Sequence, residues 1–155
     1  MRQIELEVVH WLRWDFRVQS GGGLLTTLAM RRFRDRAGFT LDGQSYAVRR
    51  TGLIHPTFHL ERGQLSVARA QTRGILRRTF AVHTGDRTIS MVERGLLGHT
   101  FTVEHGRTAL GEIRRPSALE RGAVATLDDR IDPLTGIFLL ILVQLEWRRE
   151  ARRRG

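Results

Sequence analysis

The stretch DPLTGIFLLILVQLEWRREARRRG, from Asp132 to Gly155, is the most apolar segment of the sequence, and it decides the fold. Asp132 is a good N-cap residue and Pro133 suits the first helical position, so this pattern predicts that a helix begins here. The seven consecutive apolar residues from Ile137 to Val143 leave the helix without a polar face. Such a helix has to be enclosed on all sides by protein or by lipid.

The length of the apolar run favours protein over lipid. A spanning helix needs about 20 apolar residues, whereas a shorter run is typical of a buried core helix. The run from Leu134 to Leu145 already contains polar residues and is followed by Glu146. The arginines after Trp147 would suit the C-terminus of a helix or the flank of a membrane anchor, so they do not discriminate. We predict a central helix over residues 133–149 and no transmembrane span.

Four segments in the middle of the chain share one pattern. Each begins with phenylalanine, has Leu or Val two residues on, and then turns at a glycine. Residues two apart lie on one face of a strand, so this alternation predicts half-buried strands joined as hairpins. The segments are FTLDGQSYAV from Phe39, FHLERGQLSV from Phe58, FAVHTGDRTI from Phe80 and FTVEHGRTAL from Phe101.

The turns of these hairpins fall into two kinds. Asp42-Gly43 predicts a two-residue turn, because glycine tolerates positive φ. The other three segments have one more residue before the glycine, which predicts three-residue turns with a bulge. The return strands then carry inward-facing residues four positions past the glycine. These residues are Val67, Ile89 and Leu110.

Further strands are expected outside the repeats, which brings the total to about twelve. Eight strands enclose only side chains or a small ligand, whereas about eleven can close around a central helix. We therefore predict a mainly β fold, a closed antiparallel barrel of about twelve strands around the helix, in one domain over residues 1–155. The additional strands are Gln3–Val9, Leu12–Val18, Leu24–Met30 and Ala123–Leu127.

The composition indicates a basic protein without cysteine chemistry. The formal net charge is +10, and all 26 basic residues are arginine. This charge favours polyanions such as nucleic acid or anionic lipid, although a GC-rich bacterial genome also explains the arginine and a solvated surface needs no partner. The absence of cysteine excludes disulfides and thiolate sites. Glu5 and Glu7 interrupt any signal peptide, so we expect a cytoplasmic protein.

Basic residues cluster in two places. The candidate anion-binding residues are Arg69, Arg73, Arg77 and Arg78, which have no acid between them. If Arg69 ends one strand and Arg77 starts the next, their charges meet at one rim, where a phosphate group or an anionic surface would fit. No aromatic residues alternate with them as a stacking platform needs, so nucleic acid is the weaker partner. The second cluster contains Arg31, Arg32, Arg34 and Arg36.

The sequence contains no recognisable catalytic motif. There is no glycine-rich phosphate loop, no nucleophile elbow and no obvious histidine, carboxylate and nucleophile set. His55 and His59 have a spacing that could bind zinc on a helix, but Pro56 and the repeat register favour a strand there. We therefore predict no catalytic residue, no metal site and no cofactor.

Serial hairpins of the form F-x-[LV]-x-x-G followed by an apolar C-terminal helix resemble the tubby C-terminal-like superfamily, which includes tubby proteins, phospholipid scramblases and LURP-one-related proteins. The resemblance covers residues from Phe39 to Arg149. It implies a twelve-stranded barrel threaded by the helix and, as in tubby proteins, phosphoinositide head groups bound by basic surface residues. The cysteine-rich and calcium-binding segments of scramblases are missing here, which puts scramblase activity in doubt.

These observations lead to one functional expectation and two alternatives. We expect a non-enzymatic binding module that engages anionic lipid head groups or a membrane surface through basic rim residues, peripheral to the membrane. The first alternative is a structural or protein-interaction module with no small ligand. The second is a nucleic-acid-binding protein.

Overall fold

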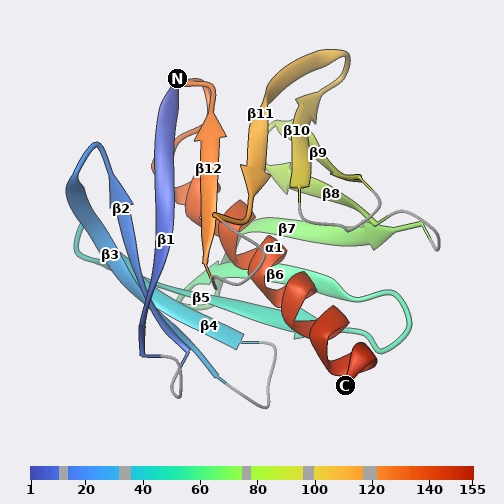
Figure 1. The fold of residues 1–155 in the computed structure, drawn as a ribbon, viewed down its shortest axis with the longest axis horizontal. Helices are drawn as coiled ribbons and strands as arrows, with labels where there is room; N and C mark the ends of the chain where they lie inside the picture. Colours follow the sequence, from blue (N-terminus) through green and yellow to red (C-terminus); the bar gives the residue numbers. More distant parts are fainter. Residues whose placement is uncertain (11–13, 32–35, 75–77, 96–99, 117–121) are drawn as a thin grey trace.

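A computed structural model describes residues 1–10, 14–31, 36–74, 78–95, 100–116 and 122–155. In these ranges, twelve antiparallel strands form one closed barrel, and one helix runs through it (Figure 1). The predicted fold class is confirmed. The strands are β1 (Arg2–His10), β2 (Asp15–Ser20), β3 (Gly23–Met30), β4 (Arg36–Leu41), β5 (Gln44–Thr51), β6 (Thr57–Arg62), β7 (Leu65–Arg73), β8 (Thr79–Thr84), β9 (Arg87–Arg94), β10 (Thr100–His105), β11 (Thr108–Arg114) and β12 (Ala123–Leu127), and the helix is α1 (Pro133–Arg154).

The strands follow one another around the barrel in sequence order. Each strand pairs with its neighbours in the chain, and β1 pairs with β12 to close the wall, with Arg2 opposite Leu127. All tight turns therefore lie at one end of the barrel, which we call the hairpin end. The six connections that start from the odd-numbered strands lie at the opposite end, which we call the link end.

The turns at the hairpin end are shorter than predicted. Each of the four repeat hairpins has two residues between its strands, and the three predicted three-residue turns are wrong. Their glycines take the first turn position with positive φ, as a two-residue hairpin turn requires. The preceding residues remain in the strand. These glycines are Gly63, Gly85 and Gly106.

Register shifts accompany two of these hairpins. They lie between Leu60 and Glu61 in β6 and between Val103 and Glu104 in β10, whereas β8 and β9 pair without a shift. Of the three predicted inward-facing residues on the return strands, two are buried and one is only partly buried. In order of burial these are Ile89, Leu110 and Val67.

The inner face of the barrel carries the repeated phenylalanines. Phe58, Phe80 and Phe101 are at most 1% exposed, and their rings stand 6.1–6.3 Å apart along the wall. Tilted aromatic pairs at this spacing are favourable beyond the area that they bury. The predicted strand from Leu12 begins at Asp15 within the described residues, and residues 12 and 13 lie outside them.

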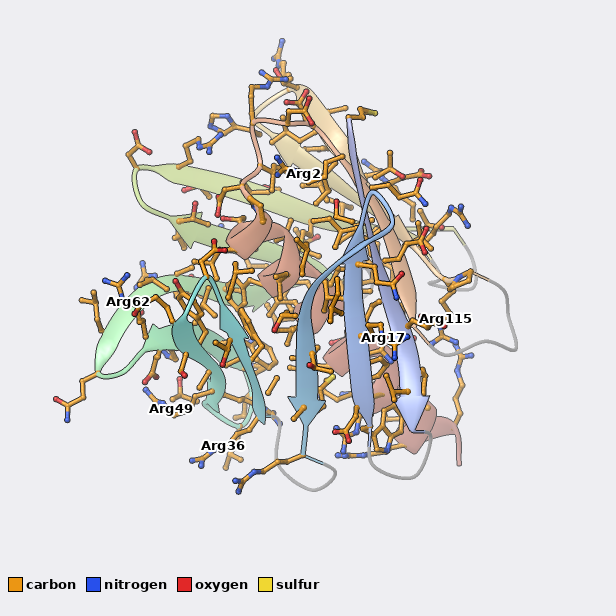
Figure 2. All side chains as sticks on the ribbon, turned by 90° about the vertical axis from the view of Figure 1, so that its left-hand side faces the viewer. Arg2, Arg17, Arg36, Arg49, Arg62 and Arg115 are labelled. Carbon is orange, nitrogen blue, oxygen red and sulfur yellow. The ribbon has the colours of Figure 1, made fainter. Side chains whose placement is uncertain are left out.

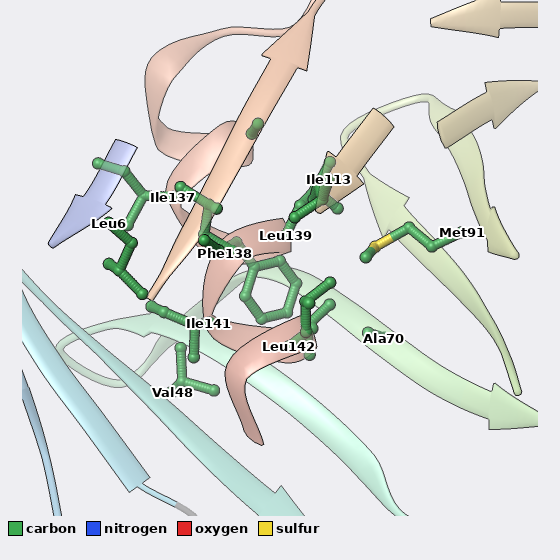
Figure 3. Close-up of a cluster of buried hydrophobic side chains, with 14 of the residues drawn as sticks. Leu6, Val48, Ala70, Met91, Ile113, Ile137, Phe138, Leu139, Ile141 and Leu142 are labelled. Atoms are coloured by element: carbon green, nitrogen blue, oxygen red, sulfur yellow. The ribbon is translucent and has the colours of Figure 1, made fainter. Parts of the chain in front are cut away.

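The helix fills the barrel, as its apolar sequence predicts. The Asp132 side chain accepts hydrogen bonds from the Thr135 backbone N (3.1 Å) and Oγ1 (2.6 Å), which fixes the helix start. All residues from Ile137 to Val143 are fully buried, and each side chain of this kind stabilises the fold by about 1.5–3 kcal/mol. Figure 3 shows helix side chains among residues from several strands, namely Leu6, Val48, Ala70, Met91 and Ile113.

The helix extends beyond the predicted end at residue 149 and reaches Arg154. Within the described residues, no helix has both the length and the apolar content that a membrane crossing requires. Its first turn lies at the hairpin end, where Arg2 Nη1 donates to the Ile131 carbonyl at 2.9 Å. Its C-terminal turns therefore emerge at the link end.

Candidate functional site: the basic link end of the barrel

Exposed arginines gather at the link end, where the odd-numbered strands and α1 finish. Among the described residues, none of these arginines has a carboxylate within ion-pair distance. Figure 2 shows Arg36 low on the barrel and Arg2 toward the opposite end. We call this set the link-end arginines, and its members are Arg31, Arg36, Arg73, Arg114, Arg153 and Arg154.

Two arginines face each other across β4 and β5 at the start of β4. Arg36 lies directly opposite Arg49 of β5 in the antiparallel register. Like charges in this position destabilise a sheet. Glu61 offsets the charge of Arg49 through a 2.7 Å contact from Arg49 Nε, and Arg36 has no such contact among the described residues.

The hairpin end differs from the link-end arginines in that its charges form ion pairs. Asp42 and Asp86 lie in its turns, and Asp128, Asp129 and Asp132 lie between β12 and the helix. Asp128 Oδ1 accepts hydrogen bonds from the side chain and backbone of Arg130, which lower the pKa of Asp128 to about 2. Asp129 lies 3.5 Å from the N-terminal ammonium group. Acids therefore accompany the bases at this end.

The helix also contains buried polar residues, which lie inside the barrel before its exposed C-terminal turn. Glu146 is 1% exposed and forms an ion pair with Arg78, which precedes β8. Burial lowers the pKa of Arg78, and the nearby positive charge of Arg153 lowers it further. Gln144, two residues earlier in the helix, is 4% exposed, and its Oε1 has no hydrogen-bond partner among the described residues.

Two cation–π contacts surround the same turns of the helix. The Arg115 guanidinium lies 4.6 Å from the Trp147 ring centre, and the Arg148 guanidinium lies 4.8 Å from the Trp14 ring centre. Such contacts hold a guanidinium against an apolar surface. Burial also lowers the pKa of Arg115. The buried Arg148 and the half-buried Arg115 attach the helix to the wall, whereas the link-end arginines are exposed.

The structure separates the four predicted anion-binding residues. Arg69 lies in the middle of β7, opposite His59 and His83, so the condition that it ends a strand at the rim is not met. Arg73 ends β7 and is exposed at the link end. Arg78 lies at the same end but is mostly buried against Glu146. Arg77 lies outside the described residues.

The second predicted cluster is divided in the same way. Arg31 and Arg36 flank the connection between β3 and β4 at the link end, and Arg32 and Arg34 lie outside the described residues. Sequence reasoning missed Arg114 and the arginines of the last helical turn as members of one surface. The strand order could have grouped these arginines. In a barrel of serial hairpins, the odd-numbered strands end where the C-terminal helix emerges.

The exposed arginines at the link end have the chemistry to bind anions. Guanidinium groups donate several hydrogen bonds and suit phosphate oxygens. Within the described residues, no group of three or more His, Asp or Glu side chains could hold a metal ion. No family model matches the chain, and no curated protein or solved structure matches it.

Proposed function

We propose that this protein is a non-enzymatic binding module that engages anionic lipid head groups at a membrane surface through its link end. The observation that carries the proposal is the group of exposed arginines at the link end that form no ion pair among the described residues. Glu93 and Glu150 lie at the same end, near the half-buried Arg78, whereas aspartates at the hairpin end form ion pairs with Arg130 and the N-terminal ammonium group. A surface with this polarity would orient toward a negatively charged plane.

The electrostatic attraction between these arginines and an anionic membrane is strong enough for reversible binding. An arginine near an anionic lipid surface contributes about 1 kcal/mol, and its field decays within a Debye length of about 10 Å. Several such residues at one end can act together, because a flat membrane reaches all of them. The resemblance to tubby C-terminal-like proteins points toward the same class of ligand.

The test is co-sedimentation with vesicles of phosphatidylcholine alone and of phosphatidylcholine with phosphatidylglycerol, at low and high salt. We expect binding only to the anionic vesicles and loss of that binding at high salt. Absence of binding to anionic vesicles at low salt would refute the proposal. Tighter retention on mixed nucleic acid than on anionic vesicles under the same conditions would favour the nucleic-acid alternative instead.

A matched pair of variants locates the binding surface. Arg36→Gln/Arg73→Gln removes two charges from the link end, and Arg62→Gln/Arg107→Gln removes two exposed charges near the hairpin end. The net charge changes equally, so long-range attraction is matched. We expect the first variant to lose about 2 kcal/mol of vesicle binding and the second to lose much less. Equal losses would argue against an oriented surface.

A further inference from the structure

An apolar tip projects from the basic link end. The connection between β5 and β6 contains Leu53 and Ile54, which are 90% and 85% exposed. They are adjacent in the sequence and are the most exposed large hydrophobic residues among those described. Single exposed hydrophobic residues are ordinary on protein surfaces, but a neighbouring pair with almost no protein contact is not.

The backbone around the tip is held in place. The Pro56 carbonyl accepts hydrogen bonds from the Thr72 backbone N (3.3 Å) and from Thr72 Oγ1 (3.4 Å). The Thr51 hydroxyl donates to the Thr57 carbonyl at 3.5 Å. Both strands that carry the connection are thereby fixed at its base. The side chains of Leu53 and Ile54 are therefore exposed on a connection whose base is held by hydrogen bonds.

The neighbours of the tip in the barrel order are basic. The connection lies between those that join β3 to β4 and β7 to β8. Arg31 and Arg36 flank the first, and Arg73 precedes the second. Figure 1 shows the β5–β6 connection at the same end of the barrel as the C-terminus of α1. Cations thus lie beside both connections that neighbour the apolar pair.

We propose that the Leu53–Ile54 tip inserts into the interfacial region of an anionic phospholipid bilayer while the link-end arginines contact the head groups. This inference rests on the proposed function and adds the orientation and depth of binding. Apolar side chains beside cations match the layered chemistry of an anionic bilayer, in which phosphate overlies hydrocarbon. A second copy of the chain fits poorly, because docking through this end would oppose arginine to arginine.

The first experiment removes the apolar tip and keeps the charge. Leu53→Ser/Ile54→Ser is compared with Leu24→Ser/Leu65→Ser, which removes two exposed leucines at the hairpin end. The vesicles contain phosphatidylcholine and phosphatidylglycerol, and circular dichroism checks folding. We expect binding to fall about tenfold or more for the tip variant, because two apolar side chains lose their transfer from water. The control should bind like the wild type.

The second experiment reports depth. The chain contains no cysteine, so Ile54→Cys and Leu65→Cys each carry one polarity-sensitive fluorophore at a chosen site. With anionic vesicles, we expect a blue shift at position 54 and quenching there by lipids brominated in their acyl chains. The label at position 65 should remain in water.

The outcomes separate the two proposals. If the wild type binds anionic vesicles in a salt-sensitive way but the tip variant binds equally and the label at 54 stays in water, the insertion is refuted and the proposed function survives. If the wild type does not bind anionic vesicles at low salt, both are refuted. A doubled mass in solution that Leu53→Ser/Ile54→Ser abolishes would identify a second copy as the occupant and overturn the insertion.

Discussion

The ion pair between Glu146 and Arg78 gives the sharpest test of how the link end is built. Glu146→Gln keeps the size of the side chain but removes its charge, which leaves the Arg78 guanidinium without its carboxylate. The Glu146 side chain is 1% exposed and that of Arg78 is 16% exposed. Breaking a buried pair by removing one partner costs about 3–5 kcal/mol. We expect the lower value, about 3 kcal/mol, because Arg78 retains some access to water.

An exposed pair provides the matched control. The side chains of Arg94 and Glu104 are 47% and 31% exposed, with 3.3 Å between Nη2 and Oε1. Glu104→Gln makes the same chemical change on the outer wall. Exposed pairs contribute about 0–1 kcal/mol, so this variant should remain within about 1 kcal/mol of the wild type.

The assay is urea unfolding followed by circular dichroism and tryptophan fluorescence. Glu146→Gln should lower the midpoint without changing the slope, and its melting temperature should fall by about 6–12 °C for a chain of this size. Arg78→Met/Glu146→Leu should recover most of the loss, because apolar residues often replace a buried ion pair without cost. If Glu146→Gln unfolds at the same urea concentration as Glu104→Gln, the buried pair does not stabilise the link end.

Three further predictions concern individual residues. Gly111→Ala would place Cβ against the Thr126 carbonyl oxygen at φ +138, so it should lower the unfolding free energy by about 3 kcal/mol or more. Gly106→Ala meets open space at φ +60 and should lower it by only about 1–2 kcal/mol, as measured by urea unfolding. Gln144→Leu removes a buried acceptor that has no partner among the described residues, and it should raise the unfolding free energy by about 1 kcal/mol. A decrease of more than about 1 kcal/mol would contradict this. Because the pKa of Asp128 is lowered, its stabilising contribution is present above its unfolded pKa and disappears as the pH falls toward 2. In Arg130→Gln, NMR titration should show the pKa of Asp128 rising toward 3.8. An unchanged pKa would contradict the hydrogen bonds from Arg130.

The fold was largely predictable because the alternation in the strands and the apolar run in the helix both indicate a barrel closed around a helix. Phe58 and Leu60 alternate with polar residues as a half-buried strand requires, and the apolar run from Ile137 to Val143 admits only an enclosed helix. The turns were placed less well. Sequence spacing cannot show whether Glu61 still pairs with β7, because pairing at the end of a hairpin depends on the twist and register of both strands.

The candidate site was predicted only in part because proximity in sequence is not proximity in a barrel. Arg69 and Arg73 are four residues apart, yet one lies on the side wall and the other at the link end. Glu146 and Arg78 are distant in the sequence, and only the emergence of the helix at the link end brings them together. The apolar pair at Leu53 and Ile54 did carry a signal, since two adjacent large apolar residues stand in a short connection that also contains Gly52 and Pro56.

The closure of the barrel by β1 and β12 also constrains the order in which the protein can be assembled during translation. Arg2 pairs only after its partner Leu127 has been made, and the helix that runs through the barrel follows all twelve described strands in the chain. A nascent chain therefore carries twelve half-apolar strands before their common core has left the ribosome. Unpaired strand edges and exposed apolar faces are aggregation-prone, so protection of the growing chain matters most immediately before the helix is made.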